Sequence, residues 1–206
     1  GMHNACAAAA ASLGGAPAAA HTALMAVAWL CFNFGDVGSS LAQAYLPAFA
    51  TAVPSSTTEQ NFDLAAALPT LGALLKCTLS ISATVVCLSS LLLTICSGQI
   101  TRDPAVRQQM RRVLPLMIAT LATHSTAVTL EGLLLARKNF RGLTITYTGV
   151  ALTVAAALSL IRASGVGLLG IWVVYVWWCA ARVLAFASFG GLLSKTSRES
   201  MQWLSK

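Results

Sequence analysis

Five long apolar runs dominate the chain, at about residues 18–47, 68–96, 113–136, 143–161 and 166–190. A helix needs roughly 20 apolar residues to cross a hydrocarbon core of about 30 Å. Each run has about that length or more, so the pattern predicts five complete membrane-spanning helices. A sixth apolar piece, residues 5–13, is too short to cross. No basic segment precedes it as in a signal peptide, and we interpret it as the end of a truncated helix.

Polar and turn-forming residues separate these runs. A polar loop without basic residues covers 54–61, and Asp103 followed by Pro104 is typical of a helix N-terminus, with the acid as cap and proline in the first turn. The turns at 137–141 and 162–167 are short. We therefore expect consecutive helices to be antiparallel neighbours.

The composition agrees with a lipid environment. Of all residues 57% are hydrophobic and 9% are charged, and the mean hydropathy is +0.75. A soluble domain of ordinary composition would be far less apolar. We expect an all-α polytopic membrane protein embedded in the lipid bilayer, with one transmembrane bundle over residues 1–190 and a polar C-terminal tail over residues 191–206.

The formal net charge of +7 comes from basic residues at the predicted helix ends. This placement favours anchoring at anionic headgroups over nucleic-acid binding, which would need a basic soluble module. Lys and Arg outside the spans number five on one side of the membrane and six on the other. Charge bias therefore predicts no orientation.

Glu131 is the most unusual polar residue, because it lies in the run 113–136, where the only other ionisable side chain is His124. A charged side chain at membrane depth costs roughly 3 kcal/mol on insertion scales and indicates a functional site. Seven residues separate the two groups, which places them on nearly the same helix face. We take Glu131 and His124 as candidate cation-coupling residues.

A second polar stripe lies in the first long run. Spacings of three, four and three residues place its members on one face of a helix, where they are candidates for a solute path. The alternatives are hydrogen bonds between helices for the uncharged members and an interfacial position for Asp36. Gly35 and Gly38 flank the acid and could allow close helix approach. The stripe comprises Asn33, Asp36, Ser40 and Gln43.

Other notable side chains receive plainer interpretations. All six cysteines lie in apolar runs without a C-x-x-C pair, so we expect free thiols. Lys76, Arg137 and Arg182 are interpreted as snorkelling or interfacial side chains. No catalytic motif and no metal-ligand spacing occurs, so we predict neither an enzyme nor a cofactor or metal site. The tryptophans of the last run, expected to serve packing or the interface, are Trp172, Trp177 and Trp178.

Two segments resemble the multidrug and toxic compound extrusion (MATE) transporter family. Residues 129–140, TLEGLLLARKNF, are similar to the acid-glycine motif and following polar turn of that family's tenth helix. Residues 18–21, Gly35-Asp36 and residues 42–44 are similar to its eighth helix. The resemblance covers about residues 5–190. It is closest to the DinF-like branch, which includes plant plastid-envelope exporters of salicylate-type aromatic acids.

This resemblance implies a six-helix bundle, with its first helix truncated, that forms the C-terminal half of a twelve-helix transporter. The partner would be an N-terminal six-helix bundle. The implied activity is antiport that couples H⁺ or Na⁺ entry to export of organic solutes or xenobiotics. Glu131 and His124 would couple the cation, and the polar stripe would line the solute path. The implied location is the plastid envelope, or alternatively the plasma or vacuolar membrane.

A rival interpretation is a membrane scaffold without transport activity. In that case Glu131 merely pairs with a basic group such as Arg182. The sequence leaves both alternatives open, and it does not identify the substrate or the coupling ion.

Overall fold

The computed structural model describes residues 2–52 and 60–193. Apart from residues 191–193, the predicted C-terminal tail lies outside this described part. The elements in chain order are α1 (Met2–Ala11), α2 (Gly15–Tyr45), the 3₁₀ turn η1 (Leu46–Phe49), β1 (Ala50–Ala52), β2 (Gln60–Phe62), α3 (Leu64–Ile95), α4 (Ser97–Ile100), α5 (Pro104–Ala136), α6 (Phe140–Ser164) and α7 (Leu168–Phe189).

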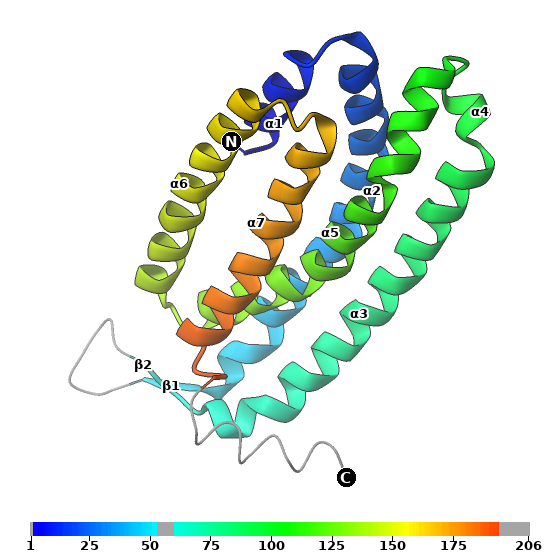
Figure 1. Ribbon diagram of the computed structural model, residues 1–206. Coiled ribbons are helices and arrows are strands. Elements are labelled where there is room, and N and C mark those ends of the chain that lie inside the picture. The colour runs from blue at the N-terminus through cyan, green and yellow to red at the C-terminus, as the bar shows by residue number, and fades with distance from the viewer. Residues whose placement is uncertain (1, 53–59, 194–206) are drawn as a thin grey trace.

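Five of the described helices are long and apolar enough to cross a membrane: α2 with η1, α3, α5, α6 and α7. This confirms the predicted all-α multi-pass membrane protein with five spans. The spans lie side by side and alternate in direction, because successive connections lie at alternate ends of the bundle (Figure 1). The preceding piece, α1, is a ten-residue helix at the end of the bundle where α2 begins.

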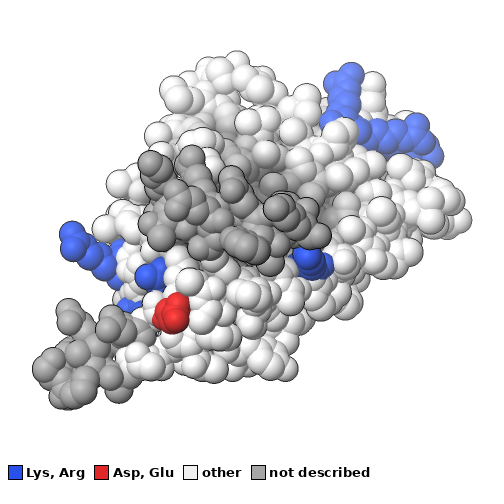
Figure 2. Space-filling view, turned by 90° about the horizontal axis from the view of Figure 1, so that it is seen from below, with Lys and Arg blue, Asp and Glu red and all other residues white. Residues whose placement is uncertain are grey.

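The outer surface of the spans is apolar. Four leucines on α3, α6 and α7 are more than 60% exposed, as suits side chains that face lipid. Seen from the end where the β-hairpin lies, the molecule is largely uncharged, and Lys and Arg occur in small separate groups (Figure 2). The leucines are Leu88, Leu152, Leu160 and Leu184.

The link between α2 and α3 differs from the predicted polar loop. Strands β1 and β2 pair antiparallel, with Ala50 opposite Phe62. The expectation of irregular structure over residues 54–61 is therefore wrong at residues 60–61, while residues 53–59 lie outside the described chain. Phe62 packs against a buried cluster that includes Leu71 and Leu74 of α3, and Arg137 Cζ lies 5.3 Å from the Phe62 ring centroid. Pairing satisfies the backbone groups of a segment that leaves one helix and returns to the next.

Helix α5 is the centre of the bundle, since it packs most extensively against α2 and α7. The contact with α2 is close because glycines lie at it, as the flanking positions of Asp36 suggested. A Cβ atom on Gly132 would lie 2.7 Å from both Ala42 Cβ and Ser39 O. A Cβ on Gly35 would lie 2.7 Å from His124 Cδ2. Small residues thus bring the backbones of α2 and α5 together.

The start of α5 is capped as predicted. The Asp103 carboxylate accepts a hydrogen bond from Ala105 N at 2.8 Å, and Pro104 occupies the first turn. Asp63 and Asn139 cap α3 and α6 in the same manner. These side chains satisfy backbone donors that a helix leaves free at its first turn.

We expect Asp103→Ala to lower the free energy of unfolding by about 1 kcal/mol, the usual cost of losing an N-cap. Asp103→Asn keeps an oxygen acceptor and should lose less. Unfolding of the purified chain by a denaturing detergent in mixed micelles measures both values. Equal losses for the two variants would show that the hydrogen bond to Ala105 contributes nothing.

Candidate functional site

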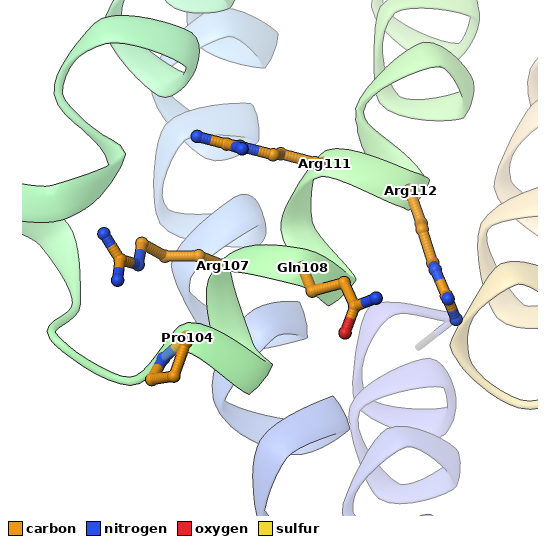
Figure 3. A pocket seen from close by; sticks show the side chains of 5 residues that line it. All are labelled: Pro104, Arg107, Gln108, Arg111 and Arg112. Atoms are coloured by element: carbon orange, nitrogen blue, oxygen red, sulfur yellow. The ribbon is translucent and has the colours of Figure 1, made fainter.

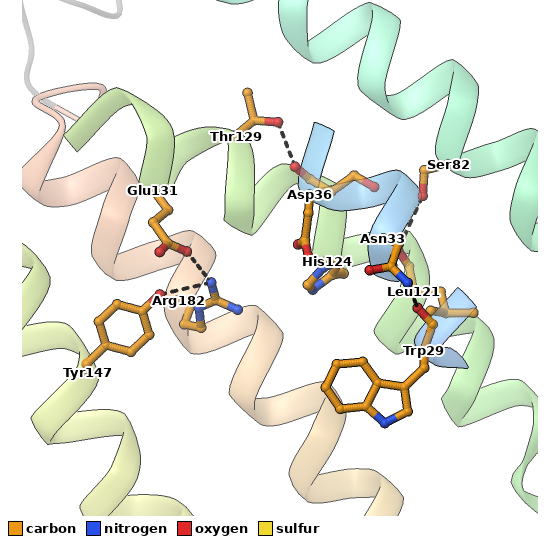
Figure 4. A network of polar contacts seen from close by, with 11 residues as sticks. Trp29, Asn33, Asp36, Ser82, Leu121, His124, Thr129, Glu131, Tyr147 and Arg182 are labelled. Atoms are coloured by element: carbon orange, nitrogen blue, oxygen red, sulfur yellow. Dashed lines mark hydrogen bonds and ion pairs between the residues drawn. The ribbon is translucent and has the colours of Figure 1, made fainter. Parts of the chain in front are cut away.

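Four ionisable side chains from three neighbouring helices form two pairs (Figure 4). Asp36 of α2 pairs with His124 of α5, and Glu131 of α5 pairs with Arg182 of α7. All four lie in helices that qualify as membrane spans. These two pairs are the salt bridges formed among the residues that the structure describes.

The first pair joins a buried imidazole to an exposed carboxylate. His124 Nε2 lies 3.1 Å from Asp36 Oδ1, and the side chains are 7% and 59% exposed, respectively. The imidazole lies beside Phe32, with ring centroids 4.4 Å apart. Its Nδ1 atom is buried and has no hydrogen-bond partner among the described residues. The exposed Asp36 carboxylate of α2 is thereby linked to a side chain of α5 that is buried in the bundle.

The second pair is more deeply buried. Arg182 Nη2 donates to Glu131 Oε2 at 2.5 Å and to Tyr147 Oη at 3.3 Å. The Arg182 side chain is 3% exposed and that of Glu131 is 21% exposed. The interpretation of Arg182 as a snorkelling side chain is therefore wrong. A guanidinium inside a bundle can satisfy its charge with a nearby carboxylate, which removes the need to reach the headgroups.

Trp178 lies between the two pairs. Its ring is stacked with the His124 ring at 6.4 Å, and Arg182 Cζ lies 4.5 Å from its ring centroid. The latter distance is that of a cation–π contact. Sequence reasoning assigned Trp178 to packing or the interface. Its position one helical turn before Arg182, the single charged residue of α7, is the signal that could have placed it at this site.

The polar stripe of α2 faces outward. Its four members are exposed in this chain. Asn33 Nδ2 donates to Trp29 O at 3.0 Å, and Gln43 Nε2 donates to Ser39 O at 3.3 Å, so both amides bond to their own helix. Of the stripe, the structure brings only Asp36 into contact with the other predicted site residues. Among the described residues, the amides of Asn33 and Gln43 thus bond within α2, whereas Asp36 links α2 to α5.

The Gln43 end of the stripe borders a cavity of about 380 Å³. Pro47 of η1 and Ala50 of β1 line it on one side, and Leu135 of α5 and Lys138, just after α5, also line it. The exposed polar face therefore continues into a depression at the hairpin end of the bundle.

Buried hydroxyl groups supply hydrogen bonds between α3 and α5. Thr78 Oγ1 of α3 lies 3.3 Å from Thr129 Oγ1 of α5. Ser82 Oγ of α3 donates to Leu121 O of α5 at 3.3 Å. The sequence did not predict these contacts. Ser and Thr are frequent in α3, and the sequence does not show which of them face α5.

The two carboxylates of this arrangement can bind a proton or a small monovalent cation, and each lies beside a nitrogen-bearing side chain, the His124 imidazole or the Arg182 guanidinium. The six cysteines are free. Over residues 2–52 and 60–193, the structure contains no group of three or more His, Cys, Asp or Glu side chains placed to hold a metal ion.

Comparison of the chain with protein-family models, with curated proteins and with solved structures gives no match. The function must therefore be argued from the site itself and from the sequence pattern.

Proposed function

We propose that this chain forms one half of a cation-coupled secondary transporter that exports organic solutes. The exposed carboxylate of Asp36 within a spanning helix carries this proposal. The span Gly15–Phe49 is 35 residues long. Asp36 lies four residues from its midpoint, which is about 6 Å along the axis. We propose that the middle of this span lies at the middle of a hydrocarbon core of about 30 Å, so that Asp36 lies inside the core.

An ionised side chain at that depth is too costly to face lipid. The neighbouring Asn33, Ser40 and Gln43 are exposed on the same helix and would also face hydrocarbon. A water-filled cleft or a covering protein surface removes this cost. The proposed cover is an N-terminal six-helix bundle of the MATE type, and the cleft between the two halves is the proposed solute path.

The contact between Asp36 and His124 offers a way to couple cation binding to helix position. A proton or Na⁺ that binds Asp36 competes with His124 for the same carboxylate oxygen. Loss of this bond weakens a link between α2 and α5. Coupling requires that the cation bind one conformation of the transporter more tightly than the other. If the Asp36–His124 contact forms in only one conformation, the affinity of Asp36 for the cation differs between the two.

Glu131 takes part in this proposal in a different manner. Because Arg182 occupies its carboxylate, a cation binds Glu131 only in a conformation in which the pair opens. Trp178 and Tyr147 hold Arg182 from two further directions. We propose that Asp36 exchanges the cation with water, and that Glu131 with His124 completes the coupling inside the bundle.

The Glu131–Arg182 pair also favours the second candidate, a membrane scaffold without transport. A buried ion pair with a hydrogen-bonding tyrosine is sufficient to fix the positions of α5, α6 and α7. The two functions differ in the role of Asp36, since a scaffold needs no accessible carboxylate.

The substitution Asp36→Asn separates the two functions. The complete gene product is reconstituted into liposomes with a proton or sodium gradient, and flux of labelled salicylate is measured as the probe. We expect gradient-driven flux in the wild type and near-background flux for Asp36→Asn, because an amide does not exchange a cation. Asp63→Asn, which changes a carboxylate at a helix end, should keep the wild-type flux.

Absence of gradient-driven flux in the wild type, for salicylate and for a cationic dye such as ethidium, would favour the scaffold. Wild-type flux in Asp36→Asn would remove Asp36 from the coupling mechanism.

From the sequence resemblance we propose the plastid envelope as the compartment, with the plasma and vacuolar membranes as alternatives. The structure itself supports an integral multi-pass membrane protein.

A further inference from the structure

A second polar cluster lies far from the paired residues, where the chain passes from α4 into α5. Within eleven residues of sequence it contains four arginines and one acid, Asp103. Close-up, Arg107 and Arg111 point to the side of α4, whereas Gln108 and Arg112 point the other way (Figure 3). We call this group the arginine cluster, and its cationic members are Arg102, Arg107, Arg111 and Arg112.

None of the four arginines forms an ion pair with any residue that the structure describes. The Asp103 carboxylate accepts the capping bond from Ala105 N. Arg107 and Arg111 are separated by one helical turn, and like charges at this spacing destabilise a helix. The cluster therefore has an excess of positive charge that an external anion would neutralise.

The cluster also surrounds a space. A cavity of about 470 Å³ is lined by Pro104, Arg107, Gln108, Arg111 and Arg112. Gly98 of α4 lies beside this space, since a Cβ atom there would be 3.7 Å from Arg107 Nη1, an ordinary van der Waals distance.

The opposite face of the same helical turns is apolar and buried. Val106, Met110 and Val113 pack into the main core of the bundle. The arginine face is consequently directed away from the core, at the end of the long spans where α3 gives way to α5 (Figure 1). In a membrane this is the level of the lipid headgroups.

We propose that the arginine cluster binds the phosphate group of an anionic lipid. Planar guanidinium groups donate paired hydrogen bonds to phosphate oxygens, and the guanidiniums of Arg107 and Arg111 point to the same side of α5 (Figure 3). Basic residues at the cytoplasmic or matrix end of membrane helices attract anionic headgroups in this manner. This site is independent of the transport proposal, because it shares no residue with the two ion pairs. A soluble phosphate ester offers the same chemistry, and the test distinguishes the two sources.

Native mass spectrometry of the purified chain measures lipid binding in nonionic detergent. Phosphatidylglycerol is titrated against the zwitterionic phosphatidylcholine. We expect preferential binding of phosphatidylglycerol, and for the double variant Arg107→Gln/Arg111→Gln an affinity about 30-fold lower, since each basic residue near a headgroup contributes about a fivefold factor. The variant Arg107→Lys/Arg111→Lys keeps the charge but loses the paired donors, and it should fall between these values.

A matched control removes two charges from the other end of the bundle. Lys138→Gln/Arg141→Gln has the same net charge as Arg107→Gln/Arg111→Gln. Its affinity for phosphatidylglycerol should stay within about twofold of the wild-type affinity, because local contacts rather than total charge decide the affinity. Competition by millimolar inorganic phosphate would identify a soluble phosphate ester as the source, and resistance to it would identify the lipid. Equal losses in both double variants, or no preference for phosphatidylglycerol, would overturn the proposal.

Discussion

Replacing Glu131 by alanine should lower the free energy of unfolding by about 3–5 kcal/mol, the cost of leaving a buried charge without its partner. Arg182 is 3% exposed, so neither water nor a headgroup can take the place of the carboxylate. The remaining hydrogen bond to Tyr147 does not compensate the charge. Unfolding by a denaturing detergent in mixed micelles gives the value for each variant.

The double variant Glu131→Ala/Arg182→Met should recover most of this loss. Apolar replacement of a buried ion pair is often neutral or stabilising, because both desolvation costs disappear. Arg141→Ala, at an exposed arginine, serves as the control and should change stability by less than about 0.5 kcal/mol. A double variant as unstable as the sum of its single variants would show that the two side chains do not act as a pair.

Replacing Gly132 by valine should cost about 3 kcal/mol or more, since overpacking at a contact that cannot relax is at the upper end of the usual range. The new side chain would meet Ala42 Cβ and the Ser39 backbone. Backbone atoms cannot rotate out of the way, so α2 and α5 must separate. The measurement is again detergent-induced unfolding.

Gly149 provides the matched control for this prediction. It lies within α6, and a Cβ atom there would meet nothing within 4 Å. Gly149→Ala should leave stability unchanged or raise it by up to about 1 kcal/mol, because alanine favours a helix over glycine. Similar losses at the two positions would indicate that glycine serves helix flexibility rather than close packing.

The positions of the spans were predictable because lipid requires long apolar helices, and this requirement is visible in the sequence. The Asp103 cap was predictable for a local reason, since the acid and the following proline act on their own helix. The β-hairpin was not, because β1 and β2 are three residues each and pair only when the chain brings them together.

The candidate site could be predicted only within single helices. Spacing placed His124 and Glu131 on one face of α5, but it could not show that the first meets α2 and the second meets α7. One stripe contacts two helices because α5 passes between them along its length (Figure 1). Arg182 has the same local pattern as a snorkelling residue, and its burial results from the rotation of α7 against α5, which local spacing does not encode.

The central claim is that the stripe around Asp36 faces water inside the membrane. Thiol labelling tests it in membranes that contain the complete gene product, starting from a variant whose native cysteines are replaced. Ser40→Cys is compared with Leu152→Cys. Leu152 lies on the outer, apolar surface of α6 and is 68% exposed. The account predicts that a charged, membrane-impermeant thiol reagent modifies position 40 rapidly and position 152 hardly at all. Equal resistance at both positions would contradict the account, because the stripe would then face lipid or a dry interface.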